Sequence, residues 1–146
     1  MSASVHPFWW RWLLVFTFAV ILFGLCLLFL PDVLQSVFNS IIYGDAQATQ
    51  AFGAEAVRYI TFSFGISGAV MVGWMVLVLY MLYGSFRRGE AVGWNSIALS
   101  IGVWYVLDSA FSGLIGYPVN ILLNTGFVIG FVIPLAATYR AFHPAR

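Results

Sequence analysis

Charge is scarce in this sequence. Only 8% of its 146 residues are charged, against about 25% in a typical soluble domain, whereas 62% are hydrophobic. So few charges could not cover the surface of a water-soluble fold, and we predict that lipid surrounds most of the chain. The formal net charge is +1, so the composition gives no reason to expect a nucleic-acid partner.

Several kinds of functional residue are also missing. Cys26 is the single cysteine, so the chain has neither an internal disulfide nor a Cys-x-x-Cys redox pair. His6 and His143 lie outside the long apolar segments, which argues against a haem held between helices and against a Ser–His pair within the membrane. There is no glycine-rich phosphate loop either. We therefore expect no cofactor and no metal site.

Four apolar segments are long enough to cross a membrane, which takes about 20 residues of helix. They cover approximately residues 12–30, 59–82, 94–115 and 119–139. The first exceeds the roughly 7–15 apolar residues of a signal peptide, so we expect it to be a retained helix. The sequence thus predicts an all-α, four-helix transmembrane bundle that forms a single integral membrane domain over residues 1–146.

Small residues and one proline indicate how these helices pack. Gly65, Ala69 and Gly73 recur every fourth residue in the second segment, where small side chains let helix backbones approach closely in lipid. We attribute this pattern to packing within the chain rather than to a dimer seam. Pro134 interrupts the fourth segment and should leave one backbone carbonyl without its helical partner.

The connector between the first two segments has a helical pattern of its own, at approximately residues 32–43. This pattern predicts an amphipathic helix on the membrane surface. The alternative is an extension of the first helix beyond the bilayer. The apolar residues recur at helical spacing and the polar residues take the opposite face: Val33, Leu34, Val37, Phe38, Ile41 and Ile42 against Gln35, Ser36, Asn39 and Ser40.

The arginines indicate orientation. With four spans, both termini share one side of the membrane with the loop that contains Arg87 and Arg88. Five of the six cationic residues lie on that side, and only Arg58 lies on the other. Because positively charged residues are retained in the cytoplasm, we predict a multi-pass protein of the cell membrane with both termini cytoplasmic.

One acid, Asp108, lies inside the third apolar segment. An acid at the centre of a membrane helix costs about 2.5–3.5 kcal/mol on insertion scales, and such a cost usually marks a functional residue. The alternative is structural, because a polar contact between membrane helices contributes about 0.6 kcal/mol and can hold two helices together. An asparagine would serve that second purpose equally well, so the sequence favours function.

Other polar side chains are expected at the depth of Asp108. Helical spacing places Trp104, Tyr105 and Ser112 on its face, and antiparallel neighbours bring Asn124 and Ser67 level with it. At that depth no cation is expected, so we predict a neutral carboxyl hydrogen-bonded to Asn124 or Ser67. A neutral carboxyl donates one hydrogen bond, and Asn124 can accept it. The predicted ligand-binding residues form a pocket entered from outside: Arg58, Ser67, Trp104, Tyr105, Asp108, Ser112, Asn120 and Asn124.

Two stretches carry a family resemblance. "RYITFSFGISGAVMVG", from Arg58, and "LDSAFSGLIGYPVN", from Leu107, resemble the DoxX-like group of small four-helix bacterial membrane proteins. The resemblance extends roughly from Arg58 to Asn124 and implies the fold, without a defined activity. A fainter similarity to four-helix sterol-isomerase-like proteins, which use intramembrane acids, lacks a second acid here.

The sequence favours a non-enzymatic membrane protein. It would bind a small apolar or lipid-like ligand in a pocket with a polar floor, or serve as a subunit of a membrane complex. The alternative is a membrane enzyme or proton-coupled carrier in which Asp108 is the catalytic proton donor and acceptor. An antiparallel dimer of the small multidrug type is disfavoured, because dual insertion requires a weak arginine bias.

Overall fold

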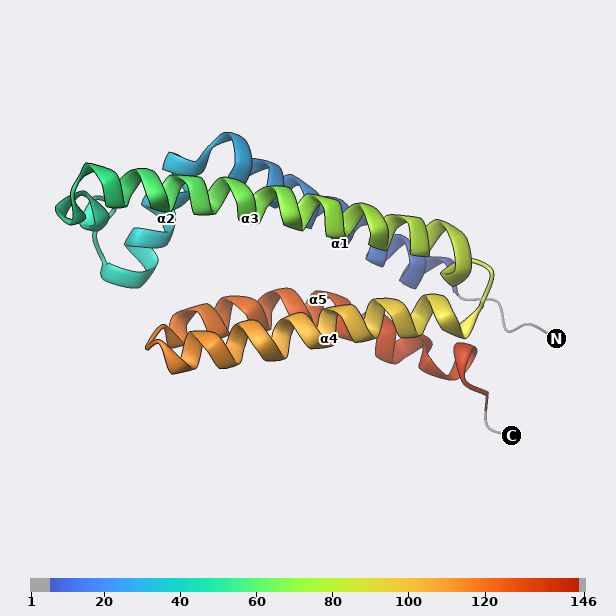
Figure 1. Cartoon of the computed structure of the whole chain (residues 1–146). Helices are drawn as coiled ribbons and strands as arrows, with labels where there is room; N and C mark the ends of the chain where they lie inside the picture. Colours follow the sequence, from blue (N-terminus) through green and yellow to red (C-terminus); the bar gives the residue numbers. More distant parts are fainter. Residues whose placement is uncertain (1–5, 145–146) are drawn as a thin grey trace. The chain divides into compact units, whose positions relative to one another are not determined.

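The computed structural model describes residues 6–144, and within this range every regular element is helical (Figure 1). Four helices are long and apolar enough to cross a membrane, which confirms the predicted all-α class and the four spans. They are α1, α3 with its π-helical extension η2, α4 and α5. The elements in chain order are α1 Pro7–Phe29, α2 Pro31–Tyr43, the short 3₁₀ helix η1 Ala48–Phe52, α3 Ala54–Met81, η2 Leu82–Phe86, α4 Ala91–Leu114 and α5 Pro118–Phe142.

The long helices extend past the apolar segments that predicted them. α1 begins at Pro7 instead of residue 12, and α3 begins at Ala54 instead of residue 59. Proline at the first helical position loses no hydrogen bond, and an acid in the first turn, here Glu55, favours a helix start. The length of the apolar segments therefore predicted the central part of each helix, while residues that favour a helix start determine where α1 and α3 begin.

Contacts divide the chain into two compact units. Unit 1 combines Met1–Thr17 with Leu77–Arg146, and unit 2 is Phe18–Val76. Large apolar side chains are exposed in both units; Leu99 of α4 is 69% exposed and Val70 of α3 is 67% exposed. Such surfaces suit lipid as the solvent. The single domain over residues 1–146 stays a prediction.

Unit 1 contains a tight hairpin of α4 and α5. Gly116 takes a left-handed conformation with φ of 83°, which glycine adopts without steric cost. The amide of Tyr117 then donates to the carbonyl of Ser112 at 2.8 Å, as in a Schellman motif, and Pro118 begins α5. With so short a turn, α4 and α5 run antiparallel, side by side (Figure 1).

The first turns of α1 pack against α5 where Pro134 interrupts its hydrogen bonds. Proline lacks an amide hydrogen, so the carbonyl of Gly130 has no donor at position 134. The indole nitrogen of Trp12 donates to this carbonyl at 3.0 Å. Gly130 also makes room for the ring of Phe16, which would overlap a β-carbon at that position. The carbonyl predicted to be left free is therefore bound by another helix.

Unit 2 contains a close approach of α1 and α3, but not at the predicted small residues. A β-carbon at Gly68 would collide with the backbone carbonyl of Gly24. Of the three predicted residues, Gly65 lies near α1, since its β-carbon would be 3.9 Å from the side chain of Leu28. Ala69 is exposed, and nothing lies within 4 Å of a β-carbon at Gly73. Rotation of α3 about its axis decides which small residues meet α1.

The predicted connector helix is present as α2, which ends at Gly44 with φ of 75°. Its polar side faces inward, toward η1. Gln35 and Asn39 are 6% and 5% exposed, and both donate to the hydroxyl oxygen of Thr49, at 2.8 and 2.9 Å. On its apolar side Val33, Val37 and Ile41 are exposed, with Val37 at 48%, whereas Phe38 packs against other aromatic rings. In water this arrangement would be inverted, because apolar side chains are normally the buried ones.

Candidate functional site

The site around Asp108 is built by the α4–α5 hairpin. Asp108 and Ser112 are four residues apart on α4, and Asn120 and Asn124 are four residues apart on α5, so each pair shares one helix face. The short turn at Gly116 brings these two faces together. The result is a polar cluster of four side chains within the membrane-crossing part of unit 1, here called the Asp108 cluster.

Three donors converge on a single oxygen of Asp108. The side-chain amides of Asn120 and Asn124 donate to Oδ1 at 2.7 and 2.8 Å, and the hydroxyl of Ser112 approaches the same oxygen at 3.2 Å. Asn120 uses its second amide hydrogen on the Ser112 hydroxyl, at 2.8 Å. Ser112 and Asn124 are buried, at 4% and 6% exposed, whereas Asp108 is half-buried.

This geometry leaves the two carboxyl oxygens of Asp108 in different situations. An oxygen has about two lone-pair sites, so three donors exceed the capacity of Oδ1, and the Ser112 bond is longer than a usual O–H···O bond. Oδ2 accepts none of the four bonds of the cluster. The cluster therefore suits a carboxylate, and equally an acid whose proton is on Oδ2.

The direction of donation differs from the sequence-based expectation. A neutral acid was expected to donate to Asn124, whereas in the structure the amides of both asparagines donate to Asp108. The reason is that each asparagine brings two amide hydrogens and the hairpin places both next to one acceptor. Asn124 is thus a partner of Asp108 as expected, with the roles of donor and acceptor reversed.

A second polar contact lies one turn further along the hairpin. The hydroxyls of Tyr105 and Thr125 are 3.0 Å apart. Thr125 directs its own hydrogen to the carbonyl of Ile121 at 2.7 Å, so Tyr105 is the donor of the pair. Thr125 was missing from the predicted site, although antiparallel pairing from Gly116 already placed it beside Asn124 at the level of Asp108. Trp104 is half-buried on the same helix.

The remaining predicted residues, Arg58 and Ser67, belong to unit 2. Arg58 pairs with Glu55 at 3.7 Å, and both side chains are largely exposed. Ser67 is exposed on α3. Their participation in a site with Asp108 stays a prediction, as does the ligand-binding role of the whole set.

Ser109 stands apart from the cluster beside it. Among residues 6–144, its hydroxyl is a buried side-chain oxygen with no hydrogen-bond partner. Such an atom costs free energy in a membrane interior, about 1–3 kcal/mol by general estimates. Within the same range, no group of three or more His, Cys, Asp or Glu side chains could hold a metal ion.

Comparisons with protein-family models, with curated proteins and with solved structures find no match for this chain. Its function must therefore be argued from its own residues.

Proposed function

We propose that this chain is an integral membrane protein that binds a small, largely apolar or lipid-like molecule through the Asp108 cluster. The polar end of the molecule would be a hydroxyl or an amine that donates a hydrogen bond to Asp108. Four membrane-length helices are compatible with the membrane location. A single carboxyl in such a helix is costly, which favours a functional reason for it.

The observation that carries this proposal is the unequal use of the two carboxyl oxygens. Asn120, Asn124 and Ser112 fix the orientation of the Asp108 carboxyl through Oδ1. Oδ2 is outside these bonds, on a half-buried residue, and can accept a hydrogen bond from a ligand without breaking any of them. A purely structural acid would gain most by spreading the donors over both oxygens.

The same observation favours the alternative, a membrane enzyme or proton-coupled carrier. A proton can join or leave Oδ2 while the bonds to Oδ1 persist, so Asp108 can change protonation state without rearranging the hairpin. A carboxyl held in a fixed position is what proton transfer requires. A third possibility is that the chain is a subunit of a membrane complex.

The experiment compares Asp108→Asn with Ser109→Ala. Asparagine keeps an acceptor oxygen for the two amides but replaces Oδ2 with a donor, so a donating ligand is rejected while the hairpin is retained. Ser109→Ala removes a neighbouring buried hydroxyl that has no partner, and is the matched control. Each protein is extracted in a mild detergent that retains bound lipids, and the mass of the intact complex is measured by native mass spectrometry.

We expect the natural protein and Ser109→Ala to carry a stoichiometric small molecule that Asp108→Asn lacks, apart from any phospholipid bound elsewhere on the protein. Equal retention by Asp108→Asn would refute the ligand role of Asp108. A co-purified protein in place of a small molecule would identify a complex subunit. Proton flux into liposomes that is abolished by Asp108→Asn, with no bound molecule on any variant, would identify the proton-coupled alternative.

The proposal includes an orientation, with both termini in the cytoplasm. Arg87, Arg88 and Arg140 then lie on the cytoplasmic side, in keeping with the positive-inside rule. Cysteine labelling from each side tests it at Gly89 and Asp45, which should react from opposite sides. Labelling of both positions from the same side, or of each position from both sides, would refute the proposed topology.

We also propose that α2 lies on the outer membrane surface with its exposed apolar side, at Val33, Val37 and Ile41, in the headgroup region. Spin labels at positions 37 and 40 test this, since Val37 is on the apolar side and Ser40 on the polar one. We expect higher oxygen accessibility at 37, and equal, water-like values would refute the placement. The resemblance to DoxX-like bacterial proteins stays a hypothesis about ancestry.

A further inference from the structure

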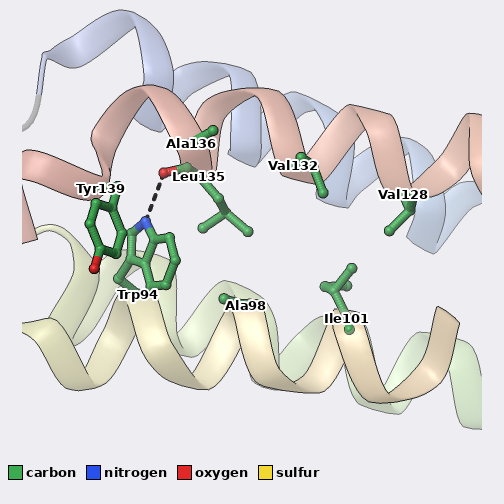
Figure 2. A pocket seen from close by; sticks show the side chains of 9 residues that line it. Trp94, Ala98, Ile101, Val128, Val132, Leu135, Ala136 and Tyr139 are labelled. Carbon is green, nitrogen blue, oxygen red and sulfur yellow. Dashed lines mark hydrogen bonds between the residues drawn. The ribbon is translucent and has the colours of Figure 1, made fainter. Parts of the chain in front are cut away.

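A hydrophobic groove lies between α4 and α5, in the half of the hairpin away from Asp108. Its volume is about 460 Å³. Among its lining residues, Trp94 and Tyr139 are the ones with polar side-chain atoms, and both are at one end (Figure 2). The indole of Trp94 already donates to the carbonyl of Leu135 at 2.9 Å. Between its ends the groove is lined by apolar side chains, which suit a hydrocarbon.

The groove exists because small residues line both of its walls. Ala98 and Gly102 on α4 lie across from Val132 and Ala136 on α5. A β-carbon added at Gly102 would meet no atom within 4 Å, so the space beside it is open. In the Asp108 half of the same hairpin, hydrogen-bonded side chains hold α4 and α5 together. The polar cluster thus joins α4 and α5 in one half of the hairpin, whereas in the other half the bond from Trp94 to Leu135 joins them at the end of the groove.

The length of the groove matches one leaflet of a bilayer. From Val128 to Tyr139, helix rise gives about 16 Å, close to half of the roughly 30 Å hydrocarbon thickness. Aromatic side chains lie together at the Tyr139 end. The ring centroids of Trp94 and Tyr139 are 5.4 Å apart in an edge-to-face contact, and those of His143 and Tyr139 are 4.6 Å apart in a stacked one. Such amphipathic rings mark the headgroup level of a membrane protein.

A cation lies at this headgroup end. Arg140 follows Val128, Val132 and Ala136 at intervals of four residues, so it continues the helix ridge that forms one wall of the groove. Helical side chains lean toward the N-terminus of their helix, and from Arg140 that is the direction in which the groove lies. Arg140 is exposed and, among residues 6–144, forms no ion pair. Arg88, by contrast, is neutralised by Glu90.

We propose that this groove binds one acyl chain of an anionic glycerophospholipid, with its phosphate beside Arg140. The apolar lining, the leaflet-long groove and the cation at the headgroup end all fit this occupant. A helix of a partner protein fits less well, because it would contact the hairpin along its whole length, whereas the groove ends before Asp108. The site is independent of the ligand proposed for Asp108.

The experiment is a lipid competition on the full chain in neutral detergent. Equal amounts of dioleoyl phosphatidylglycerol and dioleoyl phosphatidylcholine are added, and bound lipid is counted by native mass spectrometry. Gly102→Leu fills the groove from α4, and Ala136→Leu fills it from α5. Gly126→Leu is the matched control, because Gly126 also has open space around its β-carbon but does not line the groove. Arg140→Gln removes the cation and leaves the groove open.

The natural protein and Gly126→Leu should each hold one phosphatidylglycerol in preference to phosphatidylcholine. Either groove-filling variant should lose this lipid by at least about tenfold, since an acyl chain cannot share the space with a leucine side chain. Arg140→Gln should still bind a lipid, but its ratio of bound phosphatidylglycerol to bound phosphatidylcholine should fall about fivefold. Unchanged lipid binding in Gly102→Leu and Ala136→Leu would overturn the proposal. Equal binding of the two lipids to the natural protein would do so as well. So would a partner protein that co-purifies with the natural protein and is lost from Gly102→Leu, because the groove would then bind a protein.

Discussion

Replacing Trp12 by phenylalanine should destabilise unit 1 through a single backbone carbonyl. The indole of Trp12 supplies the hydrogen bond that Pro134 cannot supply to Gly130, at 3.0 Å. Phenylalanine keeps an aromatic ring but has no N–H. The carbonyl is then left without a donor in a partly buried position. Hydrogen bonds between membrane helices contribute about 0.6 kcal/mol on average and up to about 1.7 kcal/mol, which sets the expected loss.

A double-mutant cycle with Pro134→Ala separates this bond from lost ring contacts. Alanine at position 134 has an amide that can donate to Gly130, so Trp12→Phe should then cost less by about 0.6–1.7 kcal/mol. The assay is equilibrium unfolding in mixed micelles with increasing sodium dodecyl sulfate, followed by circular dichroism. Trp9→Phe is the control, because within residues 6–144 the Trp9 indole makes ring contacts but no hydrogen bond.

The result that would refute this reasoning is an equal cost of Trp12→Phe in both backgrounds. The indole N–H would then contribute nothing through Gly130, and the effect of the substitution would lie in ring packing alone. A larger cost in the Pro134→Ala background would contradict it as well, because it would show that the two groups do not compete for one carbonyl.

Two further predictions concern unit 1. Gly130→Ala should cost about 1–3 kcal/mol in the same unfolding assay, because its β-carbon overlaps the Phe16 ring, and Phe16→Ala should recover part of that loss; a neutral Gly130→Ala would contradict the contact. The hydrogen bond from Arg88 lowers the pKa of Glu90 from its usual 4.5, so the small contribution of this exposed pair to stability is complete above that value and is lost as the pH falls through the lower, folded pKa. Arg88→Gln, but not Arg87→Gln, should return the Glu90 pKa toward 4.5 in an NMR titration, and an unmoved pKa would contradict the pairing.

Composition and residue spacing indicate a lipid environment, the four long helices and the residue on which the site centres. Lipid as solvent followed from the lack of charge, because no soluble fold can cover its surface with so few charged residues. The spans followed from apolar length, since a membrane helix must satisfy its own backbone hydrogen bonds. Asp108 stood out because an acid in lipid is costly, and helical spacing with a short turn predicted its neighbours Ser112 and Asn124.

How these helices meet depends on packing between residues that are far apart in the chain. Rotation about each helix axis is not fixed by apolar residues on all sides, so the sequence could not choose Gly68 over Ala69 as the contact with α1. The sequence also could not show that the indole of Trp12 donates to the Gly130 carbonyl that Pro134 leaves without a donor. These residues are far apart in the chain, and only the packing of α1 against α5 brings them together. Nor could the sequence assign three donors to one oxygen of Asp108, because that depends on the depth and rotation of two helices together.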